Sequence, residues 1–388
     1  MATYDDDPTR ATGDGLRPVV AHCADPFLEL TTVWLYDQIR SLDRYWPIVL
    51  TQAVRNAELF PFREIHDLSR VNPLQRLWHI LRRKLGGQHQ GYGEVMRREG
   101  AVLAHAHYGH EGYRCLSAAA AAGIPLVTTF YGFDASSLPE IPVWRKRLGT
   151  LFDRGDLFLA EGPAMAERIE RLGCPGSRIR VQRLGTDLAN FDFVPPLQRS
   201  DQKSVLMYAS FREKKGHLYG VRAFSRAFGE DRETTLELVG DGPLKDEIEA
   251  EVNRLGIGSR VHFHGALPHA AAIQILRACS VLVYPSVTAK DGDTEGGAPV
   301  ALLEAMACGT PIVSSRHADI PFVAPEGTCS LLTDERDVEA LAAALIAVVT
   351  DETLAERLAR SGRQRAETYH DLKEQAASLE AVYDDVRA

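Results

Sequence analysis

Two glutamates flank a turn rich in glycine in the second half of the chain. The turn reads Glu-Gly-Gly-Ala-Pro (residues 295–299), and Glu304 follows in a helix-like run. A strand-like apolar run, residues 281–284, lies just before it. A glycine-rich turn between a strand and a helix presents backbone N–H groups to a phosphate. The carboxylates add acceptors for hydroxyl groups, so the stretch suits a sugar nucleotide; an ordinary turn with solvated glutamates is the simpler alternative.

Three further loops follow predicted strands in the same half of the chain. Arg212, Lys214 and Lys215 stand just before Gly216, and such cations can neutralise a pyrophosphate. Residues 239–243 (Val-Gly-Asp-Gly-Pro) form a tight turn, and Gly265 ends a strand whose loop has room for a nucleobase. Each loop alone is explained by a solvated or merely structural turn. Four of them in one domain indicate a ligand site.

Composition excludes several classes of protein. The formal net charge is −9 and the pI about 5.8, which argues against nucleic-acid binding. No apolar run approaches the length of a membrane-spanning helix, and residues 1–7 are too acidic for a secretory signal. The six cysteines show no C-x-x-C spacing, which argues against zinc and favours reduced thiols in the cytoplasm.

The pattern of elements predicts an α/β fold with two doubly wound, Rossmann-like parallel sheets that face each other across a cleft. Strands are expected at 18–22, 48–51, 102–106, 126–130, 157–160, 179–182, 204–209, 235–239, 261–263, 281–284 and 311–314. Helices are expected at 32–42, 114–122, 218–228, 244–255, 337–350, 354–361 and 372–386.

The predicted domain boundaries follow from breaks in this alternation. We expect a disordered tail (1–15), a first domain (16–194), a linker around two prolines (195–201), a second domain (202–370), and a final helix (371–388) that packs back toward the first domain. Ligands of such folds bind at the carboxyl ends of the strands, so the cleft is the expected site.

The motifs taken together resemble the family-4-type retaining glycosyltransferases of GT-B architecture. The resemblance covers nearly the whole chain and is carried by the residues 212–216, 239–243, 261–265, 295–299 and 304–313. It implies a UDP- or GDP-linked sugar donor held mainly by the second domain. It also implies an acceptor hydroxyl on the side of the first domain.

The family's roles are carried onto matching positions only. Lys215 then contacts the donor pyrophosphate, Glu304 the ribose hydroxyls, and Glu295 the donor sugar. The full set of implied donor-binding residues is Arg212, Lys215, Gly265, Gly296, Gly297, Ala298 and Glu304. The two glutamates lie nine positions apart (304 − 295) where the family has eight, and we expect the Gly-Gly pair to absorb the extra residue as a bulge.

Two segments of the first domain complete the resemblance. In His-Ala-His-Tyr-Gly (residues 105–109), His107 is expected to face the cleft as a catalytic and acceptor-side residue. Tyr131 stands where many relatives have histidine, and its phenol can hydrogen-bond a sugar hydroxyl. Asp134 is an acceptor contact or, alternatively, a cap of a turn or helix.

The resemblance implies a reaction without a strong protein nucleophile, a cofactor or a metal. The leaving diphosphate helps deprotonate the acceptor, while Lys215, Arg212 and the amides of Gly296 and Gly297 stabilise the growing charge. Asp-Gly-Asp (residues 291–293) only superficially resembles a metal-binding motif.

The acceptor and the alternatives stay open at this stage. Residues 73–85 form a basic amphipathic pattern, which suits either an anionic membrane surface or a core-facing helix. The hypothesis is an enzyme at the cytoplasmic membrane face that acts on a polysaccharide, lipid-linked glycan or glycolipid. Alternatives are a silent nucleotide-sugar-binding or partner subunit, an epimerase and a phosphorylase; a nicotinamide oxidoreductase is disfavoured because residues 21–25 lack the G-x-G-x-x-G turn.

Overall fold

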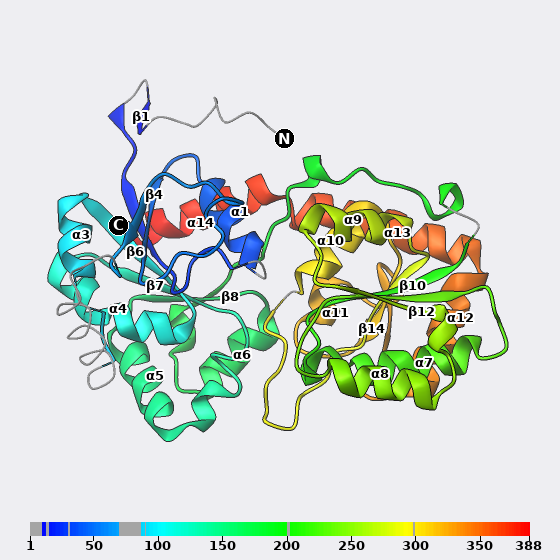
Figure 1. Cartoon of the computed structure of the whole chain (residues 1–388). Helices are drawn as coiled ribbons and strands as arrows, with labels where there is room; N and C mark the ends of the chain where they lie inside the picture. Colours follow the sequence, from blue (N-terminus) through cyan, green and yellow to red (C-terminus); the bar gives the residue numbers. More distant parts are fainter. Residues whose placement is uncertain are drawn as a thin grey trace.

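Two α/β units, each built on a parallel β-sheet, lie side by side in the molecule (Figure 1). The computed structural model describes residues 10–12, 15–29, 32–69, 87–89, 91–199, 202–297 and 299–388. Every pairing within the two large sheets is parallel, and helices connect most successive strands, although β4 and β5 are joined by a loop without a helix. The predicted architecture of two doubly wound sheets is confirmed.

The first sheet has seven strands in the order β5-β4-β3-β6-β7-β8-β9. Their bounds are β3 Val19–Cys23, β4 Trp46–Thr51, β5 Ile65–Asp67, β6 Ala101–His107, β7 Leu126–Phe130, β8 Leu157–Ala160 and β9 Ile179–Val181. The helices described around it are α1 Val33–Arg40, α3 Tyr92–Arg98, α4 Gly109–Ala122, α5 Pro142–Arg154 and α6 Pro163–Arg171. The central strands are buried along their whole length, as expected for a parallel sheet covered on both faces.

The second sheet has six strands in the order β12-β11-β10-β13-β14-β15. Their bounds are β10 Ser204–Tyr208, β11 Thr235–Val239, β12 Val261–Gly265, β13 Val281–Tyr284, β14 Ile312–Ser315 and β15 Ser330–Thr333. The helices are α7 His217–Phe228, α8 Lys245–Arg254, α9 His269–Ala278, α10 Val300–Cys308, α11 Ile320–Val323, α12 Val338–Thr350, α13 Glu352–Tyr369 and α14 Leu372–Arg387. Strand order reverses between β10 and β13, and a sheet of this kind binds ligands beside such a switch point.

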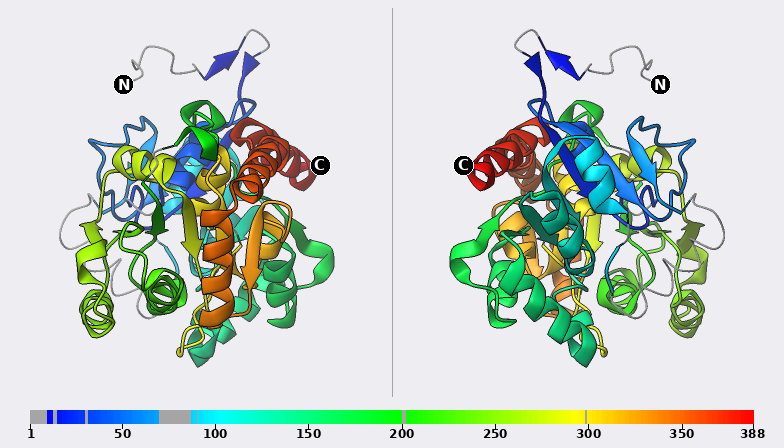
Figure 2. Two further views of the ribbon diagram at one scale, coloured as in Figure 1. Left: turned by 90° about the vertical axis from the view of Figure 1, so that its right-hand side faces the viewer. Right: turned by 90° about the vertical axis from the view of Figure 1, so that its left-hand side faces the viewer.

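The last helix, α14, leaves the second domain and lies against the first (Figures 1 and 2). Its Leu379 and Tyr383 are buried with Val20 and Leu103 of the first sheet. Burial of each such side chain contributes about 1.5–3 kcal/mol. Glu380 of the same helix accepts a hydrogen bond from the backbone N–H of Arg44 at 2.6 Å, so the chain end joins the two domains.

Some predicted elements differ from the structure. The expected helix 354–361 is part of the longer α13, and β5, β15, α3, α5, α6, α9 and α11 have no counterpart in the prediction. At the end of the expected tail, β1 (Ala11–Thr12) forms an antiparallel pair with β2 (Gly15–Leu16). The amphipathic stretch 73–85 lies outside the described residues. Among the residues that the structure does describe, no helix combines the length and the apolar character that crossing a bilayer requires.

Candidate active site

Loops at the carboxyl ends of β10 and β13 bring Lys215 and Glu295 together. The Lys215 ammonium lies 2.8 Å from the Glu295 carboxylate and donates to the Tyr284 hydroxyl at 2.7 Å. The lysine side chain is 15% exposed and that of the glutamate 6%. The pair is therefore nearly buried, with one face of the ammonium left for a ligand.

The surroundings keep Glu295 ionised. Burial pushes the pKa of this carboxyl upward, but the charges of Lys215 and Lys214, with hydrogen bonds from Lys215 and Ser286, hold the pKa below its ordinary value. The backbone N–H of Glu295 donates to His317 Nε2 at 3.1 Å. Both the charge and the position of Glu295 are thus fixed before any substrate arrives.

The glycine after Lys215 allows this loop to approach β13. Gly216 has a φ of +68°, and a Cβ built there would lie 1.9 Å from the carbonyl oxygen of Pro285. A side chain at this position would push the lysine away from Glu295. The Lys-Gly pair of the sequence is therefore a geometric requirement of the site.

Glu304 lies on α10 and is 5% exposed. Its Oε1 lies 2.6 Å from Nε2 of His269, the first residue of α9. The structure therefore places both predicted carboxylates in the second domain, each paired with a basic side chain.

The Gly296–Gly297 pair lies directly against the first domain. A Cβ on Gly296 would be 1.8 Å from the carbonyl oxygen of Tyr131, and one on Gly297 would be 2.0 Å from Cβ of Glu161. Neither glycine has a positive φ. Both glycines are thus needed for the close approach of two domains, rather than for the left-handed backbone that a glycine bulge commonly uses.

Glu161 bridges the domains at this point. It follows β8, is 4% exposed, and its Oε2 accepts the Gly297 N–H at 2.7 Å. One of the amides expected to serve a phosphate is therefore held by a carboxylate of the first domain.

Asp319 makes a second contact of this kind. It follows β14 and accepts hydrogen bonds from the backbone N–H groups of Ala164 and Met165, at 2.7 and 3.0 Å. These are first-turn amides of α6, whose own N-cap residue, Gly162, has no side chain to cap them. A second-domain carboxylate thus caps a first-domain helix.

His107 is buried at the end of β6 and does not itself line the cleft. Its Nδ1 lies 2.7 Å from the Tyr131 hydroxyl and its Nε2 lies 3.0 Å from Nδ1 of His22. Burial, with the neighbouring His105 and His22, holds the pKa of His107 well below its ordinary value, so the imidazole is neutral. His107 therefore reaches the cleft only through Tyr131, which packs on Trp34 with ring centroids 4.6 Å apart.

The structure gives Asp134 a capping role instead of a contact with an acceptor. It is fully buried, and its carboxylate accepts the backbone N–H groups of Gly109, Tyr131 and Gly132 at 2.7, 3.1 and 2.9 Å. The turn after β7 is thereby fastened to the start of α4. Of the two alternatives for Asp134, the cap agrees with these hydrogen bonds, and the carboxylate is fully buried.

The remaining predicted residues fall at the rim of the site or outside the description. Arg212 is exposed at the start of the lysine loop. Gly265 ends β12 with a φ of +69°, and a Cβ there would meet no atom within 4 Å, which agrees with open space beside it. Ala298 lies outside the described residues.

Two buried groups in the described part of the first domain have the composition of metal ligands. One is His22, His105 and His107, and the other is His89, Glu111 and Cys115. In the first group, His105 already contacts the hydroxyls of Tyr383 and Thr129, each at 2.7 Å. In the second, Glu111 lies 2.7 Å from His89 and pairs with Arg114. Side-chain hydrogen bonds thus account for most of these ligand atoms.

Five residues of the site had no signal in the sequence analysis: Glu161, Tyr284, His269, His317 and Asp319. Glu161 stands just before Gly162 and Pro163. The proline is a usable signal for the start of α6, which would have placed Glu161 in the loop between β8 and that helix. The other four act on residues distant in the sequence, and only the folded chain shows their role.

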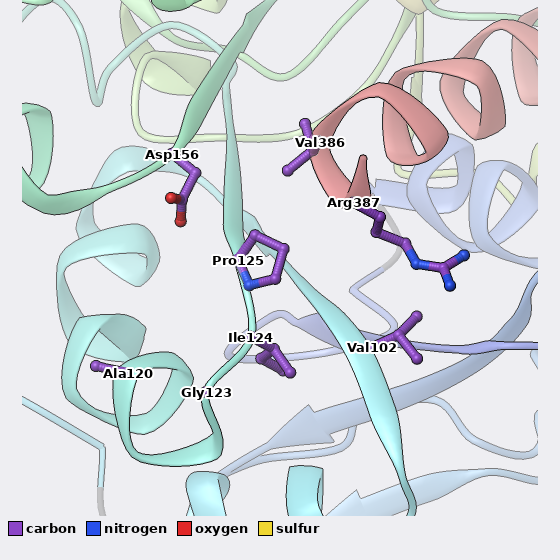
Figure 3. Close-up of a pocket in the computed structure, with 8 residues that line it drawn as sticks. All are labelled: Val102, Ala120, Gly123, Ile124, Pro125, Asp156, Val386 and Arg387. Atoms are coloured by element: carbon purple, nitrogen blue, oxygen red, sulfur yellow. The ribbon is translucent and has the colours of Figure 1, made fainter.

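A cavity of about 400 Å³ lies elsewhere, between α14 and the first sheet (Figure 3). Its lining includes Val102, Pro125 and Asp156, which stand at or just before the amino ends of β6, β7 and β8. It is therefore at the edge of the sheet opposite to the carboxyl ends that carry Glu161 and Tyr131.

Two models of known protein families match successive parts of the chain. Residues 43–190 match the family described as Glycosyltransferase Family 4, and residues 190–365 match Glycosyl transferases group 1. The putative colanic acid biosynthesis glycosyltransferase WcaL of Escherichia coli is 31% identical over 258 residues, which is 66% of this chain and 62% of that protein. The amylovoran biosynthesis glycosyltransferase AmsK of Erwinia amylovora is 29% identical over 62% of this chain and 59% of its own length. The chain thus matches less than two thirds of these relatives' length.

Solved structures show the same architecture. Anabaena HepE, determined in complex with UDP and glucose, superposes with a TM-score of 0.76 over 94% of this chain and 99% of its own, at 19% identity. A sucrose-phosphate synthase from Thermosynechococcus elongatus gives the same TM-score over 95% of this chain and 99% of its own, also at 19% identity. The GT-B fold is confirmed, and the chain belongs to the family-4-type glycosyltransferases.

Proposed function

We propose that the protein is a retaining hexosyltransferase that moves a sugar from a UDP- or GDP-linked donor to an acceptor hydroxyl. One observation carries the proposal: Lys215, Glu295 and Tyr284 form a preorganised cluster in the same domain as the buried Glu304, facing the first domain. A sugar nucleotide requires such a set, with a cation for the diphosphate and carboxylates for hydroxyls.

The proposed reaction uses Lys215 as the cation that stabilises the leaving group. Two of its ammonium protons are engaged by Tyr284 and Glu295, which leaves a third for a diphosphate oxygen. The acceptor oxygen forms a bond to the anomeric carbon while the bond to the diphosphate breaks. The acceptor proton passes to the departing diphosphate on the same face of the sugar, so that configuration is retained. No resident metal or cofactor takes part in this scheme.

Tyr131 is the first-domain residue proposed to act at the sugar, and His107 is proposed to act through it. The neutral His107 can accept a hydrogen bond from the Tyr131 hydroxyl or donate one to its oxygen, over 2.7 Å. Burial and the nearby Glu161 and Tyr108 raise the pKa of Tyr131, so the phenol stays protonated as a hydrogen-bonding group. Tyr131 would then position a sugar hydroxyl and would not serve as a base.

The acceptor is proposed to be a cell-surface polysaccharide or a lipid-linked glycan intermediate at the cytoplasmic face of the membrane. The support is the colanic acid and amylovoran biosynthesis named for two relatives. Contact with anionic lipid through residues 73–85 is a part of the same proposal.

The test combines binding with product analysis. Thermal shift against UDP- and GDP-linked sugars should identify a stabilising donor, since a ligand that binds only the folded state raises its stability. That donor, incubated with polysaccharide-repeat acceptors, should yield a product with retained anomeric configuration. Stabilisation without transfer to any acceptor would indicate a silent nucleotide-sugar-binding subunit, and an isomerised donor would indicate an epimerase.

A further inference from the structure

The buried carboxylate of Glu304 has a basic partner that no motif of the sequence contains. Nε2 of His269 lies 2.6 Å from Oε1 of Glu304, which is 5% exposed. The hydrogen bond that His269 donates to Glu304 outweighs burial and raises the pKa of His269 above its ordinary value. The contact is therefore a short, charge-assisted hydrogen bond.

The position of His269 gives its ring two different environments. It is the first residue of α9, directly after Pro268, and its side chain is 42% exposed. One edge of the imidazole meets the buried carboxylate, and the ring of Phe191 lies edge-on to it with centroids 6.3 Å apart. Asp37 of α1, in the first domain, lies close enough for His269 and Glu304 to influence its pKa.

A carboxylate that binds a ribose must present both oxygens to the two neighbouring hydroxyls. Each carboxylate oxygen has room for two donors, so one hydrogen bond at Oε1 leaves enough acceptor sites for both hydroxyls. A single firm contact at one oxygen also fixes the plane of the carboxylate. Rigid orientation before binding reduces the entropy lost when the ligand arrives.

We propose that His269 is a positioning residue for the ribose of the donor. It holds Glu304 in the orientation that accepts the 2′- and 3′-hydroxyls, and it thereby makes the site select ribonucleotides over 2′-deoxyribonucleotides. The inference rests on the proposed function, because it takes Glu304 as the ribose ligand.

Calorimetric titration with UDP, GDP and their 2′-deoxy forms tests this inference. Loss of a hydrogen bond to a charged group should make the wild-type protein bind the ribose form about 10- to 100-fold more tightly than the deoxy form. His269→Ala should weaken binding of the ribose form about tenfold. It should weaken the 2′-deoxy form by a smaller factor, because that form has only its 3′-hydroxyl on Glu304, so the preference for ribose falls. His269→Gln, whose amide can donate to Glu304, should restore most of the preference.

A matched control exists in the same domain. His262 is 50% exposed and also bonds to a glutamate, Glu237, at 2.9 Å, but it lies on β12 and has no contact with Glu304. His262→Ala should leave the ribose preference at the wild-type value. A merely structural role of His269 would lower the affinity for both sugar forms alike, together with the melting temperature.

The outcomes separate this inference from the proposed function. If the wild-type protein binds the ribose form more tightly and His269→Ala keeps that ratio, the role of His269 is refuted while the nucleotide site stands. If the wild-type protein binds neither UDP nor GDP, both are refuted. If His269→Ala does not fold, failure of the folded His269→Gln variant to retain the preference overturns the inference.

Discussion

Replacing Glu161 with glutamine should tighten the binding of a nucleoside diphosphate. In the structure, the Glu161 carboxylate is buried and accepts the Gly297 N–H at 2.7 Å. The family resemblance in the sequence assigns that amide to the donor diphosphate. The two anions would then compete for one N–H group.

The magnitude follows from this geometry. Two negative groups that share one N–H lie on the order of 3 Å apart and repel by about 5 kcal/mol at an effective dielectric constant of about 20. Glu161 must therefore swing away when the diphosphate binds, which breaks a charged hydrogen bond with a net value of about 1.5–3 kcal/mol. A glutamine would lose only about 0.5–1.5 kcal/mol. The difference of about 1–1.5 kcal/mol corresponds to roughly five- to tenfold tighter binding.

Isothermal titration of Glu161→Gln and wild type with UDP and GDP measures this difference. Glu167→Gln is the control, because Glu167 lies on α6 nearby but its side chain is 70% exposed. Affinity in the control should equal that of the wild type. Unchanged or weaker binding by Glu161→Gln would refute the competition and would indicate that Glu161 itself supports the ligand.

Three other predictions concern catalysis, domain contact and pH. Lys215→Met should lower kcat/KM for transfer at least ~100-fold, since it removes the cation at the leaving group; circular dichroism should still show a folded protein, and near-normal turnover would contradict the assignment. Asp319→Ala should cost about 0.5–2 kcal/mol of unfolding free energy in urea, because α6 loses its cap, whereas Asp319→Asn should cost less. Burial raises the pKa of Asp37 to about 6, although Arg40 and His269 oppose this shift. The folded state then binds more protons than the unfolded state between pH 4 and 6, so Asp37 lowers stability as pH rises through that window. As the pH rises from 4 to 6, the free energy of unfolding of Asp37→Asn should increase relative to that of the wild type by at most ~3 kcal/mol. Parallel pH profiles of the two proteins in urea melts would show that Asp37 titrates normally.

The fold was predictable where burial is continuous along the chain. Runs such as residues 157–160 and 281–284 are apolar and buried throughout because helices cover both faces of a parallel sheet, and the strands appear at those positions. Gly123 adopts the left-handed conformation that ends α4, as its place in the sequence predicts. Helices α5 and α6 were missed, although each begins with a proline at its first position.

The site was predictable only for residues whose partners lie on neighbouring strands. Lys215 and Glu295 meet because the carboxyl ends of β10 and β13 are adjacent in the sheet. Glu161 and Gly297 are 136 positions apart, and Asp319 and Ala164 are 155 apart, in different domains. How two domains approach each other is set by their whole surfaces, so no local pattern indicates these contacts. Asp134 differs, because two of its capping partners, Tyr131 and Gly132, are close neighbours in the chain, and a cap was one of the two alternatives that the sequence left open.

The central claim is that the second domain holds a nucleotide-sugar donor between Lys215 and Glu304. The most direct measurement is a crystal structure of the protein with the nucleoside diphosphate that stabilises it most. We expect the ribose hydroxyls on the Glu304 carboxylate, the diphosphate on the Lys215 ammonium and the loop amides, and the base beside Gly265. A nucleotide bound elsewhere, with Lys215 still paired only to Glu295 and Tyr284, would contradict the account.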